Sequence, residues 1–279
     1  MSSPPYGRIV EGDNLSVLRS LQAESVQLVY TDPPFNTGNV RTYQRLRTTQ
    51  DESGDRVGFG GRRYRSETDV SYSYGDAFEE YLGFLAPRLM EIQKVLRADG
   101  SLYLHLDARE VHYVKVALDE TFGRDCFLNE IIWAYDYGGR PRRRWPAKHD
   151  NILVYVKDRE RYVFNREAID RVPYLAPGLV SKEKAERGKL PTDVWWQTIV
   201  GTNAKERTGY PTQKPVALAE RIIRASSDEG ELVLDPFAGS GTVGAAAERL
   251  GRRYLLIDDN PEAVEVMRAR LPQAEVSQP

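Results

Sequence analysis

The segment Asp32-Pro33-Pro34-Phe35 combines residue types that point directly to chemistry. Proline has no backbone N–H and holds its φ angle nearly fixed. The Asp32 carboxylate and the Pro33 carbonyl are therefore two acceptors that one donor group can reach. An aromatic amine fits them, because it needs two acceptors to draw its lone pair out of ring conjugation and attack an electrophilic methyl group. Asp32 would stabilise the charge on the nitrogen, and Phe35 would stack on a base that has left its helix.

A second segment, LDPFAGSGTVG at residues 234–244, has G-x-G-x-x-G spacing at Gly239, Gly241 and Gly244. It follows an apolar run and opens a helical pattern, which is typical of a turn that lets the backbone approach an adenosine-containing cofactor. Asp258 ends the next apolar run and can accept hydrogen bonds from ribose hydroxyls. This pattern alone leaves a dinucleotide and S-adenosylmethionine open.

Asp235 helps to distinguish these two cofactors, because it comes at the end of the apolar run that precedes the glycines. A carboxylate there suits the α-amino group of S-adenosylmethionine and would repel a pyrophosphate. A nicotinamide-dependent oxidoreductase would explain the glycines but leaves Asp32 to Phe35 without a role. The two segments together therefore favour S-adenosylmethionine, with S-adenosylhomocysteine as the product.

Both segments resemble those of the amino-group DNA methyltransferases, which methylate adenine N6 or cytosine N4. The D-P-P-F block precedes the G-x-G block, an order similar to that of the permuted β class, and the resemblance covers nearly the whole chain. Four further blocks carry it: residues 12–14 (GDN), 101–107 (SLYLHLD), 149–157 (HDNILVYVK) and 210–215 (YPTQKP).

This resemblance implies roles for particular residues. The catalytic block would be Asp32, Pro33, Pro34 and Phe35, Asp13 would lie beside the cofactor adenine, and Lys214 would contact the cofactor carboxylate. The full set expected to hold the cofactor is Asp13, Asp32, Lys214, Asp235, Pro236, Phe237, Gly239, Gly241, Thr242 and Asp258. Asp at the first position of the block is common in the adenine enzymes, so we expect adenine N6 methylation. Cytosine N4 methylation is the alternative, and an RNA or protein substrate stays open.

Charge is unevenly distributed, although 39 Lys and Arg nearly balance 41 Asp and Glu. A net charge of −2 argues against a protein that coats DNA through overall positive charge. Arginines cluster at 40–65, and residues 138–148 hold Arg140, Arg142, Arg143, Arg144 and Lys148, with Tyr43, Tyr64 and Trp145 interleaved. Solvated loops are the simplest interpretation. Because residues 216–279 are acidic, the two runs fit better with one face that meets double-stranded DNA. A non-catalytic DNA-binding module would explain the arginines but not a cofactor site.

The elements that position these residues are short apolar strands alternating with helices. We expect strands at 8–10, 26–31, 101–106, 130–135, 151–156, 231–235 and 253–258, and helices at 76–97, 108–121, 215–226, 242–250 and 260–270. Asp76 is a candidate N-cap, Pro87 should kink or divide its helix, and Asn260 should cap the last one. The alternation predicts an α/β fold with a mostly parallel sheet, both faces covered. By the resemblance it is the Rossmann-like seven-stranded methyltransferase sheet in circularly permuted order, with one antiparallel strand.

Two stretches, 37–75 and 157–210, lack strong periodicity and exceed ordinary loop lengths, so we expect functional insertions. Residues 157–194 are the candidate target-recognition insertion of a single catalytic domain over 1–279. Trp195 and Trp196 should face opposite ways, one in the core and the other free to line a base pocket.

The remaining composition restricts other classes of protein. A lone Cys126 excludes an internal disulfide, and His105, His112 and His149 show no metal-ligand spacing. His105, inside an apolar run, suits the core better than a role as base. The absence of a long apolar run or a signal-peptide pattern predicts a cytoplasmic protein with no membrane contact, which the resemblance would place at the nucleoid. A homodimer and a cognate restriction endonuclease are further partners that the resemblance suggests.

Overall fold

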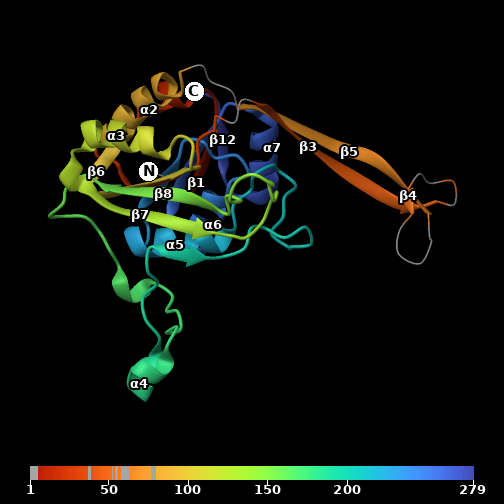
Figure 1. The fold of residues 1–279 in the computed structure, drawn as a ribbon. Helices are drawn as coiled ribbons and strands as arrows, with labels where there is room; N and C mark the ends of the chain where they lie inside the picture. The colour runs from red at the N-terminus through yellow and green to blue at the C-terminus, as the bar shows by residue number, and fades with distance from the viewer. Residues whose placement is uncertain (1–5, 37–38, 52, 54–55, 58–62, 77–79) are drawn as a thin grey trace.

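A nine-stranded sheet lies between two layers of helices (Figure 1). The structure is a computed structural model that describes residues 6–36, 39–51, 53, 56–57, 63–76 and 80–279. In spatial order the strands are β12 (Glu275–Ser277), β1 (Gly7–Glu11), β11 (Arg253–Asp258), β10 (Leu232–Asp235), β2 (Val26–Thr31), β6 (Leu96–Leu106), β8 (His149–Val156), β7 (Phe127–Ala134) and β9 (Val194–Trp196).

The pairing of the strands confirms the predicted sheet. Every neighbouring pair is parallel except those of β8, which runs antiparallel to both β6 and β7. All seven expected strands form. The three-residue strands β9 and β12 extend the two edges, and neither is long enough to show a periodic signal.

The circular permutation is visible in the strand order. β10 and β11 come late in the chain but lie between β1 and β2, which come first. Since these four strands are parallel to one another, their carboxyl ends meet at one edge of the sheet. Ligands of open α/β sheets bind at such an edge.

Three helices cover each face of the sheet. The first face carries α1 (Asn14–Ser20), α2 (Tyr81–Val95) and α3 (Val111–Phe122), and the other carries α5 (Val216–Ser226), α6 (Thr242–Arg249) and α7 (Pro261–Arg270). Their buried residues form two separate apolar cores. The start of α7 is as predicted: the Asn260 side chain accepts from Glu262 N, and Pro261 takes the first helical position. Within the described residues no helix is both long and apolar enough to cross a bilayer.

The start of α2 differs from the prediction. Asp76 ends a strand, and the helix begins only at Tyr81, after Glu80. The helix also runs through Pro87 without division. An interior proline costs about 3 kcal/mol, but Leu85, Leu89 and Ile92 are fully buried against the sheet. Burying three such side chains stabilises the helix by more than that cost.

The described part of the 37–75 stretch is mostly β-structure. β3 (Asn39–Gln50) and β5 (Arg63–Asp76) pair as a long antiparallel hairpin, with β4 (Arg56–Val57) beside its tip. The hairpin projects from the body as an arm (Figure 1). Residues 37–38, 52, 54–55, 58–62 and 77–79, and the side chains of Tyr43 and Tyr64, lie outside what is described.

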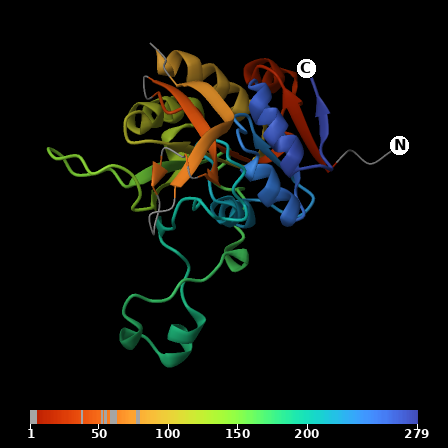
Figure 2. The ribbon, with the colours of Figure 1, turned by 90° about the vertical axis from the view of Figure 1, so that its right-hand side faces the viewer.

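Residues 157–193 do form an extended excursion with little regular structure. It contains only the short turns η3 (Arg166–Ala168) and η4 (Pro177–Leu179) and the helix α4 (Lys182–Arg187). The segment around α4 lies well away from the sheet in both views (Figures 1 and 2). A third projection, the loop between β7 and β8, leaves the body on another side (Figure 2).

Candidate active site

The carboxyl edge of the sheet holds a cavity of about 320 Å³. β10 and β11 end at it with Asp235 and Asp258, and Asp32 directly follows β2, so three strands place one carboxylate each at the cavity. The segment Tyr210–Lys214, which precedes α5, forms another wall. The lining also includes Asn14, Tyr30, Thr31, Pro33, Pro34, Phe35, Phe84, Arg88, Pro236, Phe237, Ala238, Gly239, Ser240, Thr242, Val243, Asp259 and Asn260.

Asp235 is a buried carboxylate at the centre of this edge. Burial raises its pKa to about 7, against hydrogen bonds from Thr31 and the Phe237 amide that favour the charged form. The Thr31 hydroxyl donates at 2.7 Å and the Phe237 N–H at 3.1 Å, both to Oδ1. A cation placed beside Asp235 would therefore gain a strong, desolvated partner.

Asp258 fixes the glycine-rich turn while it faces the cavity. Its two oxygens accept the Gly239 N–H at 2.7 Å and the Asn260 N–H at 3.0 Å, and burial raises its pKa to about 6. The turn needs glycine at two positions. Gly239 and Gly241 have positive φ angles of +49° and +70°, which other residues rarely adopt. Gly241 also leaves no room for a side chain, because a Cβ atom there would lie 2.8 Å from Met267 Cγ.

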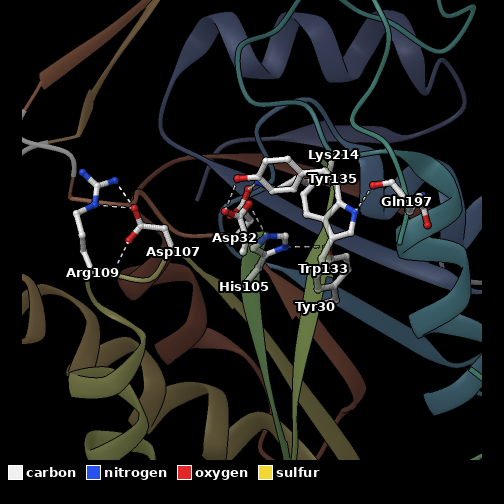
Figure 3. Close-up of polar contacts among 10 residues, drawn as sticks. Tyr30, Asp32, His105, Asp107, Arg109, Trp133, Tyr135, Gln197 and Lys214 are labelled. Carbon is white, nitrogen blue, oxygen red and sulfur yellow. Dashed lines mark hydrogen bonds and ion pairs between the residues drawn. The ribbon is translucent and has the colours of Figure 1, made fainter. Parts of the chain in front are cut away.

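Asp32 and Lys214 form an ion pair across the cavity (Figure 3). The Lys214 ammonium donates to Asp32 Oδ2, while Asp32 Oδ1 is buried with no hydrogen-bond partner among the described residues. Lys214 Nζ also lies 5.0 Å from the centroid of the Phe35 ring. Asn36, at a left-handed φ of +54°, donates to Glu110 Oε1 at 2.9 Å and so ties the end of the block to the start of α3.

A buried polar network lies behind Phe35. His105 is fully buried, and its ring centroid is 6.0 Å from that of Phe35. Its Nδ1 is 3.4 Å from the Tyr30 hydroxyl, and its Nε2 is 3.2 Å from Asp150 Oδ2 (Figure 3). The Tyr135 hydroxyl donates to the other Asp150 oxygen at 3.1 Å. His105 does not line the cavity, in agreement with a structural role.

Sequence reasoning missed several residues of the site. Arg88 donates to Asn14 Oδ1 at 2.6 Å, and the Asn14 amide donates to the Pro236 carbonyl at 2.7 Å. The rings of Phe84 and Phe237 lie 5.9 Å apart, which adds an aromatic wall. Asn14 lies in the G-D-N block and could have been found there. Phe84 and Arg88 come from α2, where no local pattern sets them apart.

Two predicted cofactor residues do not line the cavity. Asp13 is the N-cap of α1, where its side chain accepts from Ser16, and it pairs with Arg88 at 3.2 Å. Gly241 shapes the turn without facing the space. The other predicted cofactor residues do line it: Asp32, Lys214, Asp235, Pro236, Phe237, Gly239, Thr242 and Asp258. Among the residues that the structure describes, no group of three or more His, Cys, Asp and Glu could hold a metal ion.

Comparison with known proteins identifies the family. Residues 26–269 match the DNA methylase model of the N6/N4 methyltransferases. Over 95% of its length the chain is 33% identical to the type II methyltransferase M.HpaI of Haemophilus parainfluenzae, covering 74% of that protein. It is 30% identical to the DNA adenine methyltransferase YhdJ of Escherichia coli K12, over 94% of this chain and 82% of that one. The chain belongs to the DNA methylase family.

Solved structures share the fold of this methylase. The cytosine-N4-specific PvuII DNA methyltransferase aligns with a TM-score of 0.66 at 18% identity, over 97% of this chain and 89% of that one. M1.HpyAVI in complex with SAM aligns with a TM-score of 0.60 at 21% identity, over 95% and 98%. The family and fold confirm the predicted permuted methyltransferase with S-adenosylmethionine as cofactor. They exclude the nicotinamide-dependent oxidoreductase and the non-catalytic DNA-binding module.

The cavity of the methylase fits this cofactor chemically. Asp235 offers a carboxylate where an ammonium group would be stabilised, and Asp258 keeps lone pairs available for ribose hydroxyls after binding two amides. Phe84 and Phe237 line the cavity with apolar surface that would suit an adenosine group. Lys214 supplies a cation at the opposite wall.

The predicted DNA-contacting residues lie on the loop between β7 and β8. Arg140, Arg142, Arg143 and Arg144 are all exposed, and Trp145 beside them is 94% exposed. Lys148 is partly buried, and its ammonium donates to the Gly138 carbonyl at 2.7 Å, which braces the base of the loop. Of the second basic run, Arg63 and Arg65 are exposed, and the side chains of Arg41, Arg45, Arg47, Arg56 and Arg62 lie outside the described residues.

The side chains of Trp195 and Trp196, which are adjacent in β9, face opposite ways, as predicted. Trp195 is 8% exposed in the core and Trp196 is 78% exposed. Trp196 does not line the cavity, however, and its side chain is exposed to solvent.

Proposed function

We propose that this methylase transfers a methyl group from S-adenosylmethionine to the exocyclic N6 of a flipped adenine in double-stranded DNA. The observation that carries the proposal is the Asp32 carboxylate, with one oxygen buried and without a partner among the described residues, opening onto the same cavity as Asp235 and Asp258. A buried acceptor without a donor is costly, and an incoming amine would satisfy it.

Each group of the site has a part in this reaction. S-adenosylmethionine supplies an electrophilic methyl group. Asp235 binds its amino group, Asp258 its ribose, and Lys214 its carboxylate. Asp32 and the Pro33 carbonyl accept the two hydrogens of the adenine amine, while Phe35 stacks on the ring. As the bond from nitrogen to the methyl carbon forms, the methyl–sulfur bond would break and S-adenosylhomocysteine would leave as a neutral thioether. The nitrogen becomes positively charged, and Asp32 stabilises it until the extra proton passes to water. No strong base is needed, which agrees with the burial of His105 away from the cavity.

Two arguments favour adenine over cytosine. The block begins with Asp, which the resemblance associates with adenine enzymes, and YhdJ, named a DNA adenine methyltransferase, is 30% identical over most of both chains. Cytosine N4 is the second candidate, because both bases present an exocyclic amine and the solved neighbour from the PvuII system is cytosine-N4-specific.

DNA would lie against the exposed arginines of the β7–β8 loop, with residues 157–194 as the target-recognition segment of one catalytic domain over 1–279. The exposed guanidinium groups suit phosphate contacts. Such an enzyme would act at the nucleoid in the cytoplasm. Type II relatives such as M.HpaI suggest a restriction endonuclease as a functional partner, and a homodimer is the expected assembly.

The test incubates purified protein and labelled S-adenosylmethionine with unmethylated bacterial DNA and identifies the labelled nucleoside by mass. We expect N6-methyladenine, with the modified positions mapped by sequencing. Asp32→Ala should lower the rate by roughly a hundredfold or more, since it removes the group that stabilises the developing charge. Cofactor binding, measured by calorimetry, should not be weakened.

N4-methylcytosine as the product would keep the mechanism and overturn the choice of base. If the protein binds the cofactor but labels no DNA, the substrate is not DNA, and RNA becomes the next to test. An Asp32→Ala variant that methylates at the wild-type rate would remove Asp32 from the mechanism.

A further inference from the structure

The Lys214–Asp32 ion pair joins two residues from opposite walls of the cavity (Figure 3). Asp32 follows β2, and Lys214 ends the Tyr210–Lys214 segment. Both side chains are largely enclosed, at 22% and 11% exposure, so solvent screens their attraction only weakly. This pair is therefore a defined feature of the site and not a loose surface contact.

The pair conflicts with the role proposed for Asp32. The Lys214 ammonium occupies Oδ2, so the carboxylate offers the incoming amine only Oδ1. The nitrogen of the amine acquires positive charge during methyl transfer, and an ammonium group in contact with the same carboxylate repels it. The arrangement that the structure shows is thus unfavourable for chemistry, and Lys214 has to leave Asp32 first.

The charges around the cavity indicate what would draw Lys214 away. Among the described residues, the cavity is lined by four carboxylates and only two cations. The carboxylates belong to Asp32, Asp235, Asp258 and Asp259, and the cations are Arg88 and Lys214. The Arg88 guanidinium is already held at 2.6 Å by Asn14 Oδ1, at 2.7 Å by the Phe84 carbonyl and at 3.2 Å by Asp13. Lys214 has three N–H donors, and within the described residues its ammonium makes one hydrogen bond. It is the cation that can receive a ligand carboxylate.

The backbone of Lys214 stays fixed while its ammonium can move. Thr242, at the start of α6, donates to the Lys214 carbonyl at 3.1 Å and ties it to the cofactor turn. The ammonium lies 5.0 Å from the centroid of the Phe35 ring, which supports the cation without holding it in one direction. A rotation of the flexible side chain is therefore enough to exchange one carboxylate for another.

We propose that Lys214 is a charge gate that couples the two substrates: its ammonium blocks Asp32 until the carboxylate of the bound cofactor draws it away. This inference rests on the proposed function of Asp32. The consequence is positive cooperativity, in which the cofactor prepares the pocket for the target amine and futile base capture by the free enzyme is reduced. Coupling of this kind is typically 5- to 150-fold.

A first measurement concerns the cofactor alone. Calorimetry compares S-adenosylhomocysteine with its decarboxylated analogue, which keeps the adenosine and the amine. We expect Asp32→Asn to bind S-adenosylhomocysteine roughly tenfold more tightly than the wild type, because Lys214 no longer has to leave a carboxylate. Lys214→Met should bind it roughly tenfold more weakly. The analogue should bind the wild type and Lys214→Met equally. Equal affinity of both variants and the wild type for S-adenosylhomocysteine would overturn the gate.

A second measurement detects whether the target base leaves the DNA helix. The probe is a duplex with 2-aminopurine next to an adenine whose methylation has been mapped, so that the target keeps its N6 amine, and the fluorescence of the probe rises when that adenine leaves the stack. In the wild type we expect the rise with S-adenosylhomocysteine and not with the decarboxylated analogue. In Lys214→Met it should occur without any cofactor. A wild type that flips the base equally well without cofactor would contradict the gate.

The two measurements separate this inference from the proposed function. If Asp32 does not receive the amine, the calorimetric differences persist, while Lys214→Met leaves the fluorescence unchanged from the wild type. If Lys214 does not meet the cofactor carboxylate, the calorimetric differences vanish, although DNA methylation and its dependence on Asp32 remain.

Discussion

Asp235 shows how burial adapts a single carboxylate to a charged ligand. In the free enzyme it has hydrogen bonds from Thr31 and Phe237 but forms no ion pair with a described residue, and burial raises its pKa to about 7. Near neutral pH the group is therefore partly protonated. An ammonium group that binds beside it stabilises the ionised form, so binding and deprotonation are linked.

The affinity for cofactor should consequently depend on pH. Above pH 7 Asp235 is ionised, and affinity should be constant. Below pH 7 a proton must be removed on binding, and affinity should fall by up to about tenfold per pH unit. Asp258, with its pKa raised to about 6, should steepen the fall at lower pH if its charged form binds the ribose. Calorimetry with S-adenosylhomocysteine from pH 5.5 to 8.5 measures this.

Asp235→Asn supplies the control for that experiment. It should bind more weakly at pH 8 and show no break near pH 7, because its amide does not titrate. A wild-type affinity that stays constant from pH 6 to pH 8 would mean that Asp235 does not bind the amino group in its ionised form.

The sequence predicts the residues of the site correctly where those residues are neighbours in the chain. Asp32 to Phe35 and Asp235 to Thr242 each lie within one short block at a strand end, so their types and order are visible together. Phe84 and Arg88 come from α2, and only the fold brings them to the cavity. The Lys214–Asp32 pair spans 182 positions, and no local pattern could reveal that the two side chains meet.

At the scale of elements, the turn between β10 and α6 shows why the glycines are needed. Gly241 adopts φ +70°, a conformation that side-chain-bearing residues rarely adopt, and its α-hydrogens face Met267 of α7. A Cβ atom there would meet Met267 Cγ at 2.8 Å, and the turn that presents Gly239 and Thr242 to the cavity would have to shift.

Gly241→Ala should therefore lower the free energy of unfolding by about 1–3 kcal/mol, from backbone strain and overpacking together. Urea denaturation followed by circular dichroism measures it. Gly178→Ala is the matched control, because no heavy atom lies within 4 Å of its added Cβ and its φ is not positive. The control should change stability by less than about 0.5 kcal/mol. Equal stability of the two variants would show that the turn tolerates a side chain.

The elements also separate what sequence could predict from what it could not. All seven buried strands are continuous apolar runs, and the helices that cover them repeat apolar residues at helical spacing. The β3–β5 hairpin projects from the body, and its sequence, rich in Thr, Tyr, Ser and Arg, shows no apolar alternation. Its β-branched and aromatic residues were the signal available. α1 is only seven residues long, too short for periodicity to emerge.

At the scale of the whole molecule, two projections begin at the catalytic edge of the sheet. The hairpin β3–β5 follows the Asp32 block directly in the chain, and the β7–β8 loop follows Tyr135 and precedes Asp150, which contact each other behind Phe35. Both projections are thus anchored within a few residues of the base site. Contacts that they make with DNA would be transmitted to the walls of the pocket through short connections.

The exposed arginines of the β7–β8 loop should determine how strongly DNA binding depends on salt. Each phosphate contact contributes about 0.9 to the slope of log K against log salt concentration. If Arg142 and Arg143 each contact one phosphate, replacing both by Gln should make that slope shallower by about 2. Fluorescence anisotropy with a labelled duplex at several salt concentrations measures the slope.

The opposite edge of the sheet provides a control of equal charge. Arg19 lies in the last turn of α1 and Arg124 precedes β7, so both exposed side chains lie at the opposite edge of the sheet from the loop. The double variant Arg19→Gln/Arg124→Gln loses the same charge but should leave the slope unchanged, because counterions are released only where phosphates are neutralised. If both double variants lower the slope equally, the effect comes from net charge, and the β7–β8 loop does not contact the duplex.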